Sequence, residues 1–402
     1  MTRTRVAATL LLLHLGCGRL FINEVALTGA TTDPTGGGTT TVACNVTVTA
    51  NEDFDAFEAR LTTANSVICI SAGVTITNDG AEDRITLAAS GITIRGDEND
   101  ATVEFVNGRT TGVEANDSVL YASALSNLTF TGISIQTSGT AGIGVSLLNS
   151  DGYVFEKGKT YATGDGGNGI LSTSSDGTIR NSTFQSHLVS ALNHSPVALN
   201  GLSAITMSYV TVSAYSTGVL ITGNTGLEVT LTADHLTLTV TNDAIFSIDP
   251  SFITITDSTL TSNGTAAGSL AYIRYGVVSI SNSTLTSFGS AAGSYGALYM
   301  INPGGLGTST LTLTNSTVLV SGGVACLRLA NTAGNVTANL NGNTFKRLDS
   351  GSAGTDDCIK ASGGATHTIN STTNGNLFCH ENAGRTFPNV MSAGTSGTFV
   401  TA

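Results

Sequence analysis

The chain has 402 residues, with 28 Asp or Glu against 16 Lys or Arg, and its formal net charge is −12. This acidic balance, together with the lack of a basic segment interleaved with aromatic residues, argues against a nucleic-acid-binding protein. Only 11% of the residues are charged, but 40% are apolar and they recur periodically, so the composition is not that of a disordered chain.

The first 18 residues are typical of an export signal. Arg3 and Arg5 precede an apolar segment at 6–15 that is too short to span a bilayer. The sequence Leu15-Gly16-Cys17 resembles the bacterial lipoprotein processing site, and this resemblance implies that Cys17 becomes the lipidated first residue. The alternative is ordinary signal cleavage after Gly18. We therefore expect an exported protein, a lipoprotein of the outer membrane or cell surface, or otherwise a secreted protein.

Residues 19–50 are expected to form a flexible tether followed by a first strand, because Gly and Thr dominate this stretch. Residues 51–66 are expected to form a capping helix. Asp53 can cap its N-terminus, and Phe54, Phe57 and Leu61 fall on one face. A short amphipathic helix at this position would cover the open end of whatever apolar core follows.

Residues 67–379 carry a repeat that is clearest in the segment 251–288. SFITITDSTLTSNG is followed there by VVSISNSTLTSFG. Each copy alternates apolar and hydroxyl residues, which predicts a strand with one buried face, and then bends at Asp257-Ser258 or Asn282-Ser283. The apolar residue before each bend recurs about every 25 residues, which predicts a solenoid: Phe105, Phe130, Phe155, Ile179, Met207, Leu231, Ile255, Ile280, Leu313, Leu340 and Ile369.

A further short strand follows each pair, as at 218–221, 244–246 and 297–300. Three strands in a turn of this length resemble the right-handed parallel β-helices of the pectin-lyase-like class. The resemblance implies an all-β fold, a right-handed parallel β-helix with a short N-terminal capping helix, over about residues 67–378. That class includes lyases, hydrolases, adhesins and phage tailspikes, so the fold does not fix the function. Residues 380–402 are expected to form a C-terminal cap or tail.

The cysteines favour disulfides, because an exported protein meets an oxidising compartment. Cys44 with Cys69 is the favoured pair, closing the N-terminal end. Cys326 and Cys358 fall on adjacent coils when their strands are aligned, and Cys358 could instead pair with Cys379. No CxxC or His-x-His pair occurs in the sequence, so we expect neither a metal site nor a cofactor.

The block Thr355-Asp356-Asp357-Cys358 resembles the Asp-Asp-Cys block of polygalacturonases, which are glycoside hydrolases on the same fold. The resemblance implies Asp357 as general acid, Asp356 as its base partner and His380 as a supporting group. The upstream Asn-Thr-Asp of that family is replaced here by Asn343-Thr344-Phe345, and His380 stands in Cys-His-Glu rather than Gly-His-Gly. The other interpretation of the block is a solvated turn before a strand.

Basic residues near this block could hold an acidic sugar. Arg328, Lys360 and Arg385 are the available ones, and aligning the coils stacks Arg328 beside Lys360. A pectate-lyase-type calcium site would need outward carboxylates on adjacent coils. The aligned outward positions are instead hydroxyl residues interrupted by one arginine: Thr178, Thr230, Thr254, Ser279 and Thr312, then Arg180, Ser208, Thr232, Thr256, Ser281 and Thr314.

These observations predict an exported, surface-anchored rod that acts as a non-catalytic adhesin or as a structural, glycan-binding protein. The alternative is a polysaccharide-active enzyme, polygalacturonase-like or pectate-lyase-like, acting on acidic glycans. The expected partners are an extracellular or cell-surface polysaccharide and, through the lipid on Cys17, a membrane. Solenoids of this kind occur as monomers and as trimers, and both states stay open.

Overall fold

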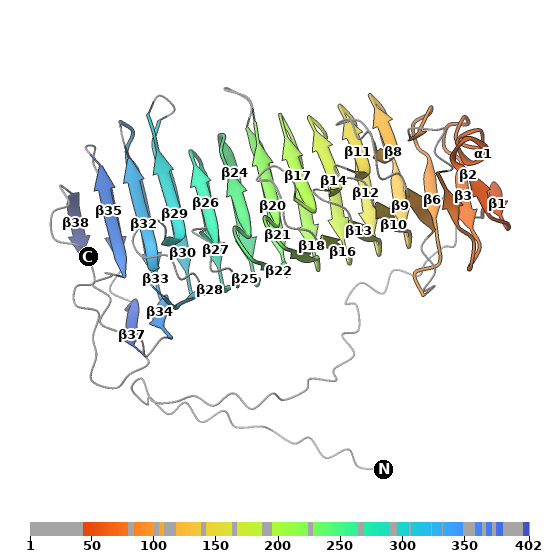
Figure 1. Cartoon of the computed structure of the whole chain (residues 1–402). Helices are drawn as coiled ribbons and strands as arrows, with labels where there is room; N and C mark the ends of the chain where they lie inside the picture. Colours follow the sequence, from red (N-terminus) through yellow and green to blue (C-terminus); the bar gives the residue numbers. More distant parts are fainter. Residues whose placement is uncertain are drawn as a thin grey trace, which may run out of the picture.

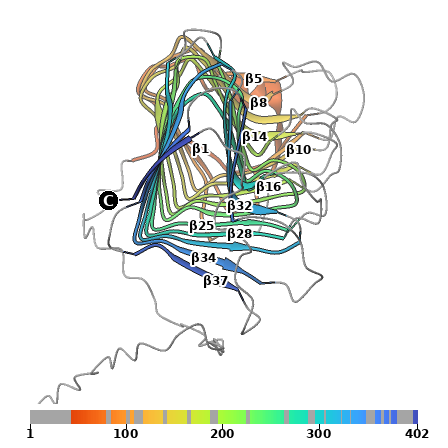
Figure 2. The same ribbon diagram turned by 90° about the vertical axis from the view of Figure 1, so that its left-hand side faces the viewer.

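The computed structural model is an all-β parallel solenoid in which most coils contribute one strand to each of three sheets (Figure 1). The structure describes residues 43–401 except 79–83, 100–103, 108–117, 138–141, 163–166, 187–194, 224–227, 264–268, 289–295, 305–306, 323, 332, 349–357, 364–366, 372–374 and 381–396. Viewed along the axis, the coils superpose and their three sheets surround a common interior (Figure 2). Every strand pair within the described ranges is parallel, as the repeat predicts.

The strands are short and fall into three sheets. The 14-stranded sheet A contains β1 (Val46–Val48), β3 (Val67–Ile70), β6 (Thr93–Arg95), β9 (Thr129–Thr131), β12 (Tyr153–Glu156), β15 (Gly177–Arg180), β18 (Ala204–Ser208), β21 (Val229–Asp234), β24 (Ser251–Thr256), β27 (Val277–Ser281), β30 (Ser309–Thr314), β33 (Val336–Asn341), β36 (His367–Ser371) and β38 (Gly397–Thr401). The 13-stranded sheet B contains β2 (Glu52–Asp53), β4 (Ile76–Thr77), β7 (Phe105–Asn107), β10 (Ser134–Thr137), β13 (Lys159–Ala162), β16 (Thr183–Ser186), β19 (Thr211–Ala214), β22 (Thr237–Val240), β25 (Thr259–Ser262), β28 (Thr284–Ser287), β31 (Thr317–Val320), β34 (Thr344–Arg347) and β37 (Leu377–His380). The 11-stranded sheet C contains β5 (Ile85–Thr86), β8 (Ser118–Ser123), β11 (Ile143–Leu148), β14 (Asn168–Thr173), β17 (Val197–Asn200), β20 (Val219–Thr222), β23 (Ile245–Ser247), β26 (Ala271–Arg274), β29 (Gly296–Asn302), β32 (Ala325–Asn331) and β35 (Ile359–Gly363).

Alternation along each strand fills the interior. In β24, Ser251, Ile253 and Ile255 are buried while Phe252 and Thr254 face outward. The inward apolar residues stack from coil to coil and form one continuous core from Val48 to Ile369. Because a single coil has only this one apolar face, it can be buried only by the coils above and below.

The stacking row that contains Ile255 corrects three of the expected repeat positions. Ile255 lies opposite Ala233, not Leu231, and Ala233 in turn lies opposite Met207. Ile369 lies opposite Ala338, and Phe105 belongs to sheet B opposite Ile135. A slip of two residues keeps every side chain on its own face, so alternation alone cannot detect it.

The bends between sheets A and B follow the expected Asx-Ser chemistry. Asp257 and Asn282 have φ angles of 49° and 51°, which their short polar side chains tolerate. The buried serines that follow link successive coils: the backbone N–H of Ser258 donates to Ser283 Oγ at 3.1 Å, and that of Ser283 to Ser316 Oγ at 3.2 Å. Each buried serine therefore satisfies a backbone donor of its neighbouring coil.

The N-terminal cap is shorter than the expected helix over 51–66. Helix α1 spans Phe54–Glu58, and turns replace the helix beyond it. Asp53 is the N-cap and accepts a hydrogen bond from the backbone N–H of Ala56 at 2.7 Å, as expected. Phe57 packs edge-on against Phe105 at 5.3 Å between ring centroids, so the cap does cover the end of the core.

A disulfide joins Cys44 to Cys69 across the first coils, with 5.7 Å between their Cα atoms. This is the pair that the sequence favoured. Cys358 is a free, buried thiol that immediately precedes β35 in sheet C, and the backbone of Cys379 lies on β37 in sheet B, so the alternative bond between them stays a prediction. No helix among the described residues is both long enough and apolar enough to cross a bilayer.

The stacked core makes a stability prediction. Phe155 is fully buried between Phe130 and Phe184, with ring centroids 6.4 and 5.5 Å away. Phe155→Ala should lower the free energy of unfolding by about 3–5 kcal/mol, because it removes the ring and leaves a cavity. Phe252→Ala is the matched control: that ring is 42% exposed, and its loss should change stability by less than about 0.5 kcal/mol. Denaturant titration of both variants tests this, and equal losses would contradict the assignment of the core.

Candidate functional site

The outward face of sheet A is mostly hydroxyl residues, with one correction to the expected columns. The register places Thr206 and Thr232, not Thr230, beside Thr178 and Thr254. The neighbouring column therefore holds Asp234, not Thr232, between Ser208 and Thr256. It also holds Glu156 beside Arg180, so this face does carry carboxylates that sequence alignment missed.

Three charged residues of sheet A, Glu156, Arg180 and Asp234, have partners within the described residues. Arg180 pairs with Glu156 at 2.5 Å. Asp234 accepts hydrogen bonds from Thr256 at 2.7 Å and from the ring of His235 at 2.8 Å. Burial alone would raise the pKa of Asp234, but these hydrogen bonds and the charge of His235 hold it below its usual value. These residues therefore have local partners at the surface of the coil.

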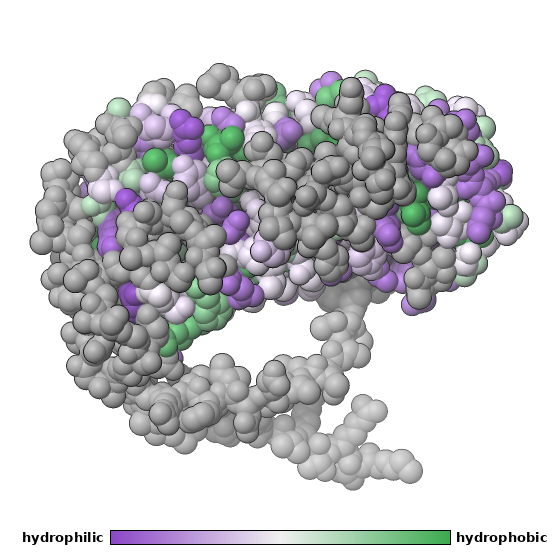
Figure 3. All heavy atoms as spheres, viewed as in Figure 1, coloured by the Kyte–Doolittle hydropathy of each residue, from purple (hydrophilic) through white to green (hydrophobic). Residues whose placement is uncertain are grey.

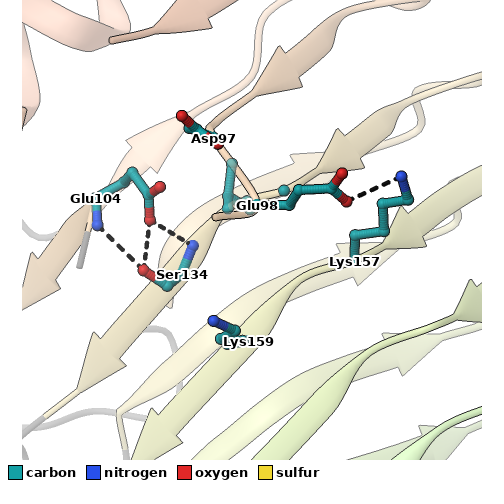
Figure 4. A pocket seen from close by; sticks show the side chains of 8 residues that line it. Asp97, Glu98, Glu104, Ser134, Lys157 and Lys159 are labelled. Atoms are coloured by element: carbon teal, nitrogen blue, oxygen red, sulfur yellow. Dashed lines mark hydrogen bonds and ion pairs between the residues drawn. The ribbon is translucent and has the colours of Figure 1, made fainter. Parts of the chain in front are cut away.

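A shallow depression lies at the corner between sheets A and B, where Asp97, Glu98, Glu104, Lys157 and Lys159 meet (Figure 4). Its space is about 160 Å³ including open solvent. Glu98 pairs with Lys157 at 2.9 Å, and Asp97 accepts the backbone N–H of Asn99 at 3.0 Å. The cluster is therefore already organised by internal contacts.

Glu104 is the buried member of that corner, with 2% of its surface exposed. Its carboxylate accepts the backbone N–H of Ser134 at 2.7 Å and also the Ser134 hydroxyl (Figure 4). Ser134 Oγ in turn lies 3.3 Å from the backbone nitrogen of Glu104. This reciprocal arrangement links β7 to β10 and gives Glu104 a structural role in joining two coils.

The Asp-Asp-Cys block is only partly described. Asp356, Asp357 and Arg385 lie outside the described residues, as does Cys17, so the acid–base pair and the lipidation site stay predictions. The backbone of His380 ends β37, but its side chain is outside the described part.

Arg328 and Lys360 are stacked on adjacent coils, as the sequence alignment predicts. Arg328 on β32 lies directly opposite Lys360 on β35. Following the same row back along sheet C gives Tyr299 on β29, Tyr272 on β26 and Phe246 on β23. We name these five residues the aromatic–cationic column.

The rings of the column touch one another along the solenoid axis. Phe246 and Tyr272 are stacked, with 4.9 Å between centroids and 22° between planes. Tyr272 and Tyr299 meet edge to face at 5.2 Å. The guanidinium carbon of Arg328 lies 5.3 Å from the centroid of Tyr299, within the range of a cation–π contact. Three rings therefore lead without a break to Arg328, and Lys360 follows it in the strand register.

The column belongs to the outer face of sheet C. In β26, Ala271 and Ile273 are buried in the core while Tyr272 is only half-buried between them. Phe246, Arg328 and Lys360 are also half-buried, and Tyr299 is 8% exposed. Four of the five side chains are thus partly exposed, and Tyr299 is the most buried of them.

The sequence analysis missed the aromatic part of the column, although three aromatic residues recur in the sequence at similar spacing. Phe246, Tyr272 and Tyr299 occupy the same position of the third strand in three successive coils. Their separations differ because the intervening loops differ in length, so only the strand register brings them together.

Comparisons with known proteins concern the fold. No protein-family model and no curated protein matches the chain. Three similar solved structures are the tailspike gp42 of Acinetobacter phage vb_AbaP_AS12 (13% identity, TM-score 0.46, 84% of this chain and 58% of that one), pectate lyase Pel9A (12%, 0.34, 89% and 80%) and the A-module of the mannuronan C-5 epimerase AlgE6 of Azotobacter vinelandii (11%, 0.34, 87% and 93%). This chain spans little more than half of the tailspike.

One carboxyl group near sheet C is strongly perturbed. Asp243 precedes β23 and is 7% exposed. Burial raises the pKa of Asp243 to about 7. The backbone N–H of Ser269 donates a hydrogen bond to the Asp243 carboxylate at 2.8 Å, and this bond lowers the pKa but does not outweigh burial. Because the pKa is higher in the folded state than in the unfolded state, the folded protein should lose stability as the pH rises from about 4 through about 7.

Asp243→Asn should therefore be more stable than the wild type at about pH 8 by up to about 4 kcal/mol, with the difference vanishing below about pH 4. The amide keeps an acceptor oxygen for Ser269. Asp176→Asn is the matched control, because Asp176 also accepts a backbone N–H, that of Ala204, but is exposed. Urea titrations across this pH range measure both effects, and a pH-independent difference for Asp243→Asn would contradict the assignment.

Proposed function

We propose that this chain is a non-catalytic glycan-binding rod whose aromatic–cationic column holds an anionic polysaccharide. The single observation that carries the proposal is the unbroken row of Phe246, Tyr272 and Tyr299 leading into Arg328 and Lys360. Successive coils are about 4.8 Å apart, so the row offers a linear surface that suits an extended polymer lying along the axis.

The two kinds of side chain in the column serve different parts of such a ligand. Aromatic rings offer apolar edges for contact with the C–H groups of sugars, and Tyr272 adds a hydroxyl group. Arg328 and Lys360 supply charge for carboxylate or sulfate groups, and the guanidinium fork of Arg328 matches a carboxylate in two hydrogen bonds.

The overall charge of −12 makes the location of these cations significant. A polyanion is repelled by the molecule as a whole, so a local cationic surface is needed for binding. Hydrophilic residues are spread along this face of the rod (Figure 3), and the two cations of the column stand at its C-terminal end, on β32 and β35. The ligand is therefore expected to bind towards the C-terminal coils.

Binding is tested with polygalacturonate as the anionic probe and dextran as the neutral control. Tyr272→Ala and Arg328→Gln should each weaken polygalacturonate binding about tenfold, because each removes a contact worth about 1–2 kcal/mol. Binding should also weaken as salt is raised, because the charges are at the surface. Tyr209→Ala and Arg180→Gln, on sheet A and its corner, are matched controls that should bind as the wild type does.

Equal binding by Tyr272→Ala and the wild type would contradict the proposal. Depolymerisation of polygalacturonate that is lost in Asp357→Asn would instead establish the enzymatic alternative.

Export and anchoring through Cys17 stay predictions from the leader, which membrane fractionation of Cys17→Ser would check.

A further inference from the structure

The interior near the C-terminal end contains two free thiols that the proposed function does not use. Cys326 lies on β32, and Cys358 immediately precedes β35. Both are fully buried. Leu327 and Ile359, the residues that follow them, are directly opposite in the strand register, so the two cysteines are neighbours on adjacent coils.

A backbone hydrogen bond joins the coils of this pair. The N–H of Leu327 donates to the carbonyl oxygen of Cys358 at 3.0 Å, which holds the two backbones at ordinary strand separation. The neighbouring Cys326 also contributes to the raised pKa of the Cys358 thiol. Neighbouring parallel strands are about 4.8 Å apart, and this lies within the range of about 4.4–6.8 Å over which Cα atoms are bridged by a disulfide. Little movement is needed to join the sulfur atoms.

We propose that Cys326 and Cys358 form an oxidation site, which closes to an inter-coil disulfide when the chain folds in the presence of a small-molecule disulfide. The bond would mirror the one between Cys44 and Cys69 at the other end of the solenoid. Solenoids are stabilised only by contacts between neighbouring repeats, so their ends open first, and a cross-link between coils acts where opening begins.

The chemistry is a thiol–disulfide exchange. One thiol loses its proton and attacks the oxidant's disulfide, forming a mixed disulfide and releasing one small thiol. The second protein sulfur then displaces the other small thiol, so the protein loses two hydrogens and two electrons and the oxidant becomes two thiols. Burial, reinforced by the neighbouring Cys326, raises the pKa of the Cys358 thiol, which disfavours attack once the core is closed.

Two routes avoid this barrier. The bond can form during folding, before the coils close. It can also form by local opening, because β35 is the terminal strand of sheet C among the described residues and pairs there with β32. The site therefore lies at one end of sheet C, where opening breaks the pairing with β32 alone.

Peptide mapping of the full chain tests the proposal directly. Unfolded, reduced protein is refolded in a glutathione redox buffer, alkylated and digested with trypsin without reduction. Cleavage at Arg274, Arg328, Arg347, Lys360 and Arg385 places Cys326, Cys358 and Cys379 in three different peptides. The expected product is peptide 275–328 linked to peptide 348–360, with a mass two hydrogens below the sum of the free peptides.

Cys379→Ser is the matched control and should leave this linked product unchanged, whereas Cys358→Ser should abolish it. A second measurement uses Cys44→Ser, which lacks the N-terminal disulfide. In this variant, the protein with the Cys326–Cys358 bond should show a higher thermal midpoint than the same protein after reduction. Separate alkylation of Cys326 and Cys358 after refolding would overturn the proposal, and so would a link between Cys358 and Cys379.

Discussion

Burial of one coil by the next is the interaction on which every other feature depends. A strand such as β24 has a single apolar face, and Ile253 and Ile255 are buried only because equivalent residues lie above and below them. Parallel hydrogen bonding fixes that register, and the buried serines at the bends extend the same ladder through the corners. The outer surface inherits this order, so equal positions on successive coils form straight columns.

The column that we assign to ligand binding is a consequence of this regularity. The packing that aligns core residues also aligns Tyr272 with Tyr299 and Arg328 with Lys360 on the outer face. A charged pair so close in register would be unfavourable by itself, and the ring of Tyr299 beside Arg328 offsets part of that cost.

Sequence reasoning predicted the features that depend on local chemistry. Alternation gave the strands, Asx-Ser pairs such as Asp257-Ser258 gave the bends, and Asp53 marked the start of the cap. It was wrong where the strand register between coils determines which residues lie opposite one another. Leu231 was taken for the stacking residue at Ala233 because a two-residue slip preserves the faces, and Asp234 was therefore missed among the outward hydroxyls. The cap was also overextended, because its apolar spacing continues to Leu61 although the chain turns after Glu58.

The candidate site, too, could be predicted from the sequence only in part. Arg328 and Lys360 could be placed from their aligned strands, but their aromatic neighbours required the register of three further coils.

Hydrogen–deuterium exchange of the full chain, with and without polygalacturonate, tests the central assignment most directly. The account predicts added protection in β26, β29, β32 and β35, with no change at the corner of Glu98 and Lys157. Protection at that corner, or on sheet A without sheet C, would contradict it.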